Sequence, residues 1–136
     1  MTLTQDERAE LIKHRVEKSR SLHNEALFLF DSGLYNTSVN RIYYAMYHAV
    51  SALALKDSFT TSKHLQLIGW FNREYVKTGR TDINSGKYLT RAFEMRSKSD
   101  YDDFVNYSQD EVKELLANME SFLETIDRLI SSTYHG

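Results

Sequence analysis

Residues 39–55 read VNRIYYAMYHAVSALAL and hold one charged residue, Arg41, and one histidine, His48. Neither proline nor glycine interrupts them. Placed on a helix at about 100° per residue, they leave no polar face wide enough to meet water. A helix that is apolar nearly all round must be covered nearly all round. This stretch therefore predicts either the central helix of a bundle or a helix that faces a second subunit.

Helix start and stop signals lie on both sides of this stretch. Thr4 with Glu7, and Ser108 with Glu111, are capping-box pairs that predict where the first and last helices begin. Gly33 can adopt the left-handed conformation that closes a helix, so we expect the first helix to end there. The last helix, over residues 109–132, has the cleanest apolar stripe in the chain and suits packing against antiparallel neighbours.

Two shorter helices are predicted in the middle of the chain. Thr61 or Ser62 can cap a third helix that ends near Gly79, and a fourth helix covers about residues 85–98. The stretch 97–107, SKSDYDDFVNY, is expected to be irregular. No segment alternates apolar and polar residues as a half-buried strand would. The sequence thus predicts one domain over residues 1–136, an all-α up-and-down bundle of four to five helices.

The composition excludes several classes of protein and several kinds of site. With 41% hydrophobic and 26% charged residues, the chain has the make-up of a globular protein. It contains no cysteine, which excludes disulfides, thiolate metal sites and cysteine nucleophiles. The N-terminus lacks the apolar core of a signal peptide, and no apolar run is long enough to span a membrane. We expect a cytoplasmic protein that does not enter a membrane.

Charge is unevenly distributed along the chain. Residues 63–98 hold eight basic and three acidic side chains, whereas residues 99–136 hold two basic and nine acidic ones. The basic segment, which includes Lys87 and Arg91, could bind phosphate. It could equally pair with the acidic C-terminal helix of the same or a partner chain, which is common on bundle surfaces.

Arg41 and His48 are two helical turns apart and share a stripe with Tyr44. As a chemical pair, His48 would act as general acid or base on a ribose 2′-hydroxyl while Arg41 binds the scissile phosphate, which requires no metal. The structural alternative is a hydrogen-bonded core histidine and an arginine whose head reaches water. His64, at the start of the third helix, is expected to face solvent.

Metal binding and cofactor binding are not predicted. The acidic run of Asp100, Asp102 and Asp103 could suggest magnesium, but a solvated loop before a capped helix explains it better. The chain shows no glycine-rich loop that could cradle a phosphate. We therefore expect neither a metal nor another cofactor.

Four stretches resemble one known family in the same order. They are GLYNTSVNRIYYAMYHAVSAL (33–53), SKHLQLIGWFNREYVKTG (62–79), GKYLTRAFEMR (86–96) and RSKSDYDDF (96–104). Together they resemble the HEPN superfamily (higher eukaryotes and prokaryotes nucleotide-binding domain), in its small stand-alone prokaryotic branch. The resemblance implies a helical bundle that dimerises, often encoded beside a minimal nucleotidyltransferase that acts as antitoxin.

Ribonuclease members of that family carry an arginine followed a few residues later by a histidine, on a later helix at the dimer cleft. The matching position here is Arg96, followed by Asp100 and Tyr101, and the histidine is absent. An ionised aspartate repels phosphate and is a weak base for a hydroxyl.

The resemblance therefore favours a component of a toxin–antitoxin or defence module that binds nucleotide or RNA and partners a nucleotidyltransferase. The predicted binding residues are Tyr44, Lys87, Arg91, Arg96, Asp100 and Tyr101. The alternative is an active, metal-independent ribonuclease toxin that uses Arg41 and His48.

Overall fold

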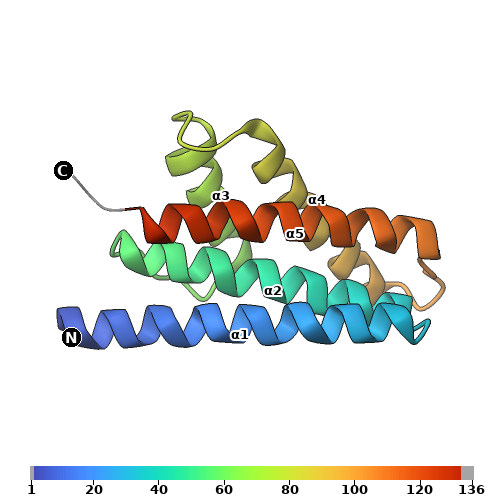
Figure 1. The fold of residues 1–136 in the computed structure, drawn as a ribbon. Coiled ribbons are helices and arrows are strands. Elements are labelled where there is room, and N and C mark those ends of the chain that lie inside the picture. Colours follow the sequence, from blue (N-terminus) through green and yellow to red (C-terminus); the bar gives the residue numbers. More distant parts are fainter. Residues whose placement is uncertain (1, 133–136) are drawn as a thin grey trace.

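The computed structural model describes residues 2–132, and they form an all-α bundle with no strand among them, as predicted. The helices in chain order are α1 (Gln5–Asp31), α2 (Tyr35–Lys56), α3 (His64–Phe71), α4 (Ile83–Tyr101) and α5 (Gln109–Ser131). A five-residue π-helix, η1 (Asn72–Val76), continues directly from α3. Figure 1 shows the three long helices α1, α2 and α5 side by side, with α3 and α4 crossing behind α5 and emerging beyond it.

The helix ends follow the signals in the sequence. Thr4 and Glu7 form the predicted capping box of α1, and Ser108 and Glu111 form that of α5. In each box the hydroxyl accepts from a backbone N–H while the glutamate accepts from the N–H of the capping residue. Gly33 has a φ of 77°, in the left-handed region, directly after α1. These predictions are confirmed.

α2 is the central helix. It contacts α1, α3, α4 and α5, which explains why its sequence is apolar on nearly every side. Serine hydroxyls join it to α1: Ser19 donates to the carbonyl of Ala45 at 2.7 Å, and Ser38 donates to that of Ala26 at 2.9 Å. Small residues at these positions let the two helix backbones approach closely. The fully buried side chains of α2 include Val39, Ile42, Tyr43, Ala45, Met46, Val50 and Leu53.

The directions of the helices follow from the connections. A short turn makes α1 and α2 antiparallel. The main neighbour of α5 is α2, and the two run in the same direction, not antiparallel as the sequence suggested, because α3 and α4 lie between them in the chain (Figure 1). Near the N-termini of α2 and α5, the Asn36 side chain donates to the Val105 carbonyl at 2.7 Å and accepts from the Tyr107 N–H at 2.9 Å. Near the C-termini of the two helices, the Lys56 ammonium donates to three carbonyls of α5 and its C-cap.

The middle helices differ in detail from the prediction. The first residue of α3 is His64, and the Lys63 before it makes no side-chain cap; Thr61 instead accepts from the Lys63 N–H at 3.1 Å. α4 begins earlier than predicted because Asp82 caps it by accepting from the Ser85 N–H. It also runs on to Tyr101, through residues expected to be irregular.

None of the helices in the described part of the chain combines the length and apolar character that crossing a membrane requires.

Candidate functional site

An aromatic cluster forms where α2, the start of α3 and the second half of α4 meet. We call it the α2–α3–α4 cluster. α2 contributes two consecutive tyrosines and a third about one turn further on. α3 contributes its first residue, and α4 contributes two residues almost one turn apart. Its members are Tyr43, Tyr44, Tyr47, His64, Phe93 and Arg96.

The buried Tyr43 fixes the state of His64. Its hydroxyl lies 2.6 Å from Nδ1 of His64, and the two rings stack with centroids 5.6 Å apart. Burial raises the pKa of Tyr43, so its hydroxyl keeps its proton at neutral pH. Within residues 2–132, Nδ1 is the acceptor that this O–H has. His64 therefore accepts at Nδ1 and, when neutral, carries its own proton on Nε2.

His64 is partly buried, contrary to the solvent-facing position that the sequence suggested. Its ring stacks on Tyr47 at 4.5 Å between centroids. Burial lowers the pKa of His64, and the positive charge of Arg96 lowers it further. Among the described residues, Nε2 has no hydrogen-bond partner. His64 thus offers a bound group a neutral N–H donor.

Arg96 projects into the aromatic rings. Its guanidinium carbon lies 5.1 Å from the ring centroid of Tyr43, 5.4 Å from that of Tyr44 and 5.7 Å from that of Phe93. Nη1 donates to Asp100 Oδ2 at 2.8 Å, one helical turn further on. The side chain is only 16% exposed, and its Nε is a buried donor with no acceptor among the described residues.

The structure gives Arg41 and His48 different neighbours. Nε of Arg41 lies 3.2 Å from a carboxylate oxygen of Glu25 on α1, and Nη1 lies 2.6 Å from the side-chain oxygen of Asn40. His48 packs against Tyr47, with ring centroids 5.3 Å apart, and has no hydrogen bond within residues 2–132. Arg41 thus contacts α1, while His48 lies beside the α2–α3–α4 cluster.

The electrostatic surroundings of His48 weaken it as a base. Burial lowers its pKa to about 4, and the nearby charges of Lys18 and Arg15 act in the same direction, with smaller effects from His14 and His64. A histidine with this pKa is neutral at pH 7 and accepts a proton poorly.

Arg96 does not share a face of α4 with the other predicted basic residues, Lys87 and Arg91. Lys87 and Arg96 are nine positions apart, about half a revolution on a helix. Lys87 and Arg91 line a shallow groove of about 320 Å³ between η1 and α4. Hydrogen bonds from Ser108 lower the pKa of Glu111 on α5, and the charges of Arg91 and Lys98 lower it further. Part of the basic segment therefore faces the acidic start of α5.

The remaining predicted residues lie near Arg96. Tyr44 is partly buried beneath its guanidinium, Asp100 is its ion-pair partner, and Tyr101 is 90% exposed at the end of α4. The sequence did not indicate the role of Tyr43, Tyr47, His64 or Phe93 in this cluster. The spacing of the tyrosines on one helix was visible, but nothing in the sequence linked them to a histidine on another helix.

No group of three or more histidine, aspartate and glutamate side chains in the described part of the chain is arranged to hold a metal ion.

Comparison with known proteins adds a family context. A family model described as the HEPN domain matches residues 12–129. A UPF0332 protein of Thermotoga maritima is 36% identical over 125 residues, which cover 92% of this chain and 95% of that protein. A UPF0332 protein of Archaeoglobus fulgidus is 35% identical over 81% of this chain and 87% of its own length. A protein of Methanocaldococcus jannaschii named "Putative toxin" is 29% identical over 86% of this chain and 80% of its own length.

Proposed function

Because this chain belongs to the HEPN domain family, as the sequence resemblance predicted, we propose that it is the HEPN component of a toxin–antitoxin or defence module and binds RNA or a nucleotide through Arg96. Two relatives from Methanocaldococcus jannaschii carry the word toxin in their names, which supports the proposed role in a toxin–antitoxin module. The proposed location is the cytoplasm, where RNA is available.

The observation that carries the proposal is the guanidinium of Arg96. It lies against two tyrosine rings and a phenylalanine ring, and it has one carboxylate partner among the described residues. Guanidinium groups bind phosphate through paired N–H donors, and aromatic faces beside them can stack on bases. The Nε2–H of His64 adds a neutral donor to the same cluster.

The same geometry favours binding over cleavage. General-base catalysis needs an accepting nitrogen, but Nδ1 of His64 is already bonded to Tyr43. His48, with its pKa of about 4, is a weak base at neutral pH, and Asp100 is paired with Arg96. The site therefore offers hydrogen-bond donors but no side chain suited to act as a general base.

The proposed partners are a second copy of the chain and a minimal nucleotidyltransferase. Both rest on the family resemblance. The end of α4 and the loop after it carry two almost fully exposed aromatic side chains, Tyr101 at 90% and Phe104 at 92%. Exposed aromatic rings of this kind are common at protein interfaces. Co-expression with an adjacent nucleotidyltransferase gene and co-purification would test this pairing.

Arg96→Gln tests the binding function. We expect a labelled single-stranded RNA to bind the wild type with an affinity that falls as salt rises, and to bind Arg96→Gln at least about tenfold more weakly. Arg128→Gln is the matched control, because Arg128 is exposed and donates only to the nearby Thr125 among the described residues. Fluorescence anisotropy measures the affinity, and circular dichroism verifies folding. Equal binding by the Arg96 variant and the control would reject the proposal.

Two further experiments distinguish the roles of the other predicted residues, Lys87, Arg91 and His48. Reversing the charges of Lys87 and Arg91 together should weaken RNA binding less than Arg96→Gln does, because both line a groove on another face of α4 and the charge of Arg91 acts on Glu111 of α5. RNA binding that does not depend on salt would indicate that Lys87 and Arg91 are solvated surface residues without a part in binding. RNA cleavage by the wild type that His48→Gln abolishes would instead support the ribonuclease alternative.

A further inference from the structure

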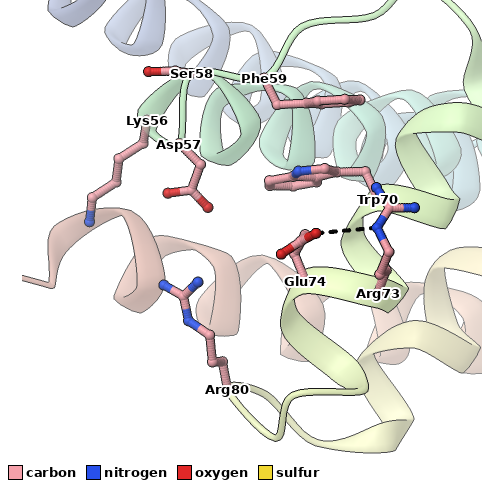
Figure 2. Close-up of a pocket in the computed structure, with 8 residues that line it drawn as sticks. All are labelled: Lys56, Asp57, Ser58, Phe59, Trp70, Arg73, Glu74 and Arg80. Carbon is pink, nitrogen blue, oxygen red and sulfur yellow. Dashed lines mark hydrogen bonds and ion pairs between the residues drawn. The ribbon is translucent and has the colours of Figure 1, made fainter.

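A cavity of about 730 Å³ lies between the end of α2, the α3–η1 segment and the loop before α4. We call it the α2–η1 cavity. Figure 2 shows charged side chains around it and two aromatic rings along one side. None of the residues that line this cavity belongs to the α2–α3–α4 cluster.

Two irregularities of the backbone meet at this cavity. η1 is a π-helical turn, a rare conformation that is frequent at functional sites. Ser58 has a φ of 64°, which makes it the one non-glycine residue in the described chain with a left-handed backbone. Such conformations persist where surrounding contacts hold them, and they cluster at ligand sites.

Arg80 is held in place without an ion pair. Its guanidinium carbon lies 4.1 Å from the centroid of the Tyr75 ring. Tyr75 is itself buried, and its hydroxyl donates to Asp57 at 2.5 Å. Ring and carboxylate thus form a fixed support under Arg80, which has no carboxylate partner within residues 2–132.

The other cations of the cavity are already engaged. Arg73 pairs with Glu74 at 3.2 Å. The ammonium of Lys56 donates to carbonyls at the end of α5, at 2.8 to 2.9 Å. Arg80 is therefore the cation best placed to bind an added oxyanion, in the fork geometry that guanidinium groups provide.

The rest of the wall suits a hydroxylated, partly apolar group. Phe59 and Trp70 stack face to face, with centroids 5.3 Å apart and planes 7° apart, along one side of the cavity (Figure 2). The carboxylates of Asp57 and Glu74 can accept from hydroxyl groups. Aromatic rings pack against the apolar C–H faces of sugars, while carboxylates bind their hydroxyls.

We propose that the α2–η1 cavity binds a sugar phosphate, with the phosphate on Arg80 and the sugar between the carboxylates and the aromatic wall. The group would come either from a free sugar phosphate or from the ribose phosphate of a mononucleotide. The volume of the cavity lies within the range of small-molecule sites. This site is independent of the RNA site proposed at Arg96.

Trp70 provides the measurement, because it is the one tryptophan of the chain and lines the cavity. Its fluorescence is followed during titration with ribose 5-phosphate, adenosine 5′-monophosphate and inorganic phosphate. We expect a saturable change with ribose 5-phosphate and at least about tenfold weaker binding of inorganic phosphate, which lacks the hydroxyls. Tighter binding of the mononucleotide would identify a nucleotide as the source, and weaker binding of the mononucleotide would identify a free sugar phosphate.

Arg80→Gln should weaken ribose 5-phosphate binding by about tenfold or more. Lys77→Gln is the matched control, since it removes the same charge from an exposed position nearby that does not line the cavity. Arg96→Gln should leave this titration unchanged, which separates the result from the RNA site. No saturable change up to millimolar ligand, or equal binding by Arg80→Gln and Lys77→Gln, would overturn the proposal.

Discussion

Acid should destabilise the fold through His48. Burial, with the nearby cations Lys18 and Arg15, lowers the pKa of this histidine from 6.5 to about 4. The unfolded chain therefore takes up the proton at a higher pH than the folded chain does. The stability that depends on neutral His48 is fully present above about pH 6.5 and is lost as the pH falls towards 4.

The size of this effect follows from the pKa difference. Taken in full, it would remove about 2 kcal/mol of stability between neutral pH and about pH 5. His48 is only partly buried, so solvent screens its charged form and reduces the expected loss to about 1 kcal/mol.

Urea unfolding at about pH 7.5 and about pH 5, followed by circular dichroism, measures this loss. His48→Gln cannot take up a proton, so its acid-induced loss should be about 1 kcal/mol smaller than that of the wild type. His14→Gln is the control, because His14 is exposed and contributes only a smaller effect to the lowered pKa of His48, so this variant should keep most of the wild-type acid response.

His48→Ala should lower stability at neutral pH by about 1 kcal/mol through lost packing against Tyr47. The absence of a hydrogen bond to His48 among the described residues places this estimate at the low end. Parallel acid responses of the wild type and His48→Gln would refute the reasoning. So would an alanine variant that is as stable as the wild type but loses a robust RNA-cleaving activity.

Three further predictions concern contacts and assembly. Tyr43→Phe removes the 2.6 Å bond to His64 and should lower the free energy of unfolding by about 0.5–1.5 kcal/mol, and an unchanged thermal melt would show that the bond adds nothing. Asn36→Ala loses both bonds to residues 105–107 and should cost about 1–3 kcal/mol in urea unfolding, whereas the exposed Asn106→Ala should cost less than about 0.5 kcal/mol. Light scattering at micromolar concentration should show a dimer, and a monomer would reject the proposed homodimer.

The predictable parts of the fold are those that local chemistry decides. Capping boxes and a left-handed glycine act within a few residues, so Thr4, Ser108 and Gly33 marked helix ends correctly. The longer α4 was missed although local signals existed. Asp82 precedes Ser85 at capping distance, and Arg96 precedes Asp100 by one turn, so their pairing supports helix where the polar residues alone suggested a loop.

The candidate site was harder to predict because its contacts are not local. Arg96 was selected from the family resemblance, but its position among tyrosine rings depends on how α4 packs on α2. His64 meets Tyr43 across 21 residues of sequence. The π-helical turn likewise carries no spacing pattern that distinguishes residues 72–76 from an ordinary helix.

Because α2 and α5 are parallel, the negative C-terminal ends of their helix dipoles lie close together. The backbone dipoles of a helix sum to roughly half a negative charge at its C-terminal end, and here two such ends lie side by side. The Lys56 ammonium lies where they meet, 2.8 to 2.9 Å from the carbonyl oxygens of Leu129, Ile130 and Ser132. One amine is therefore the counter-ion of two helices. An antiparallel pair cancels its own poles, whereas this parallel pair places a lysine between them.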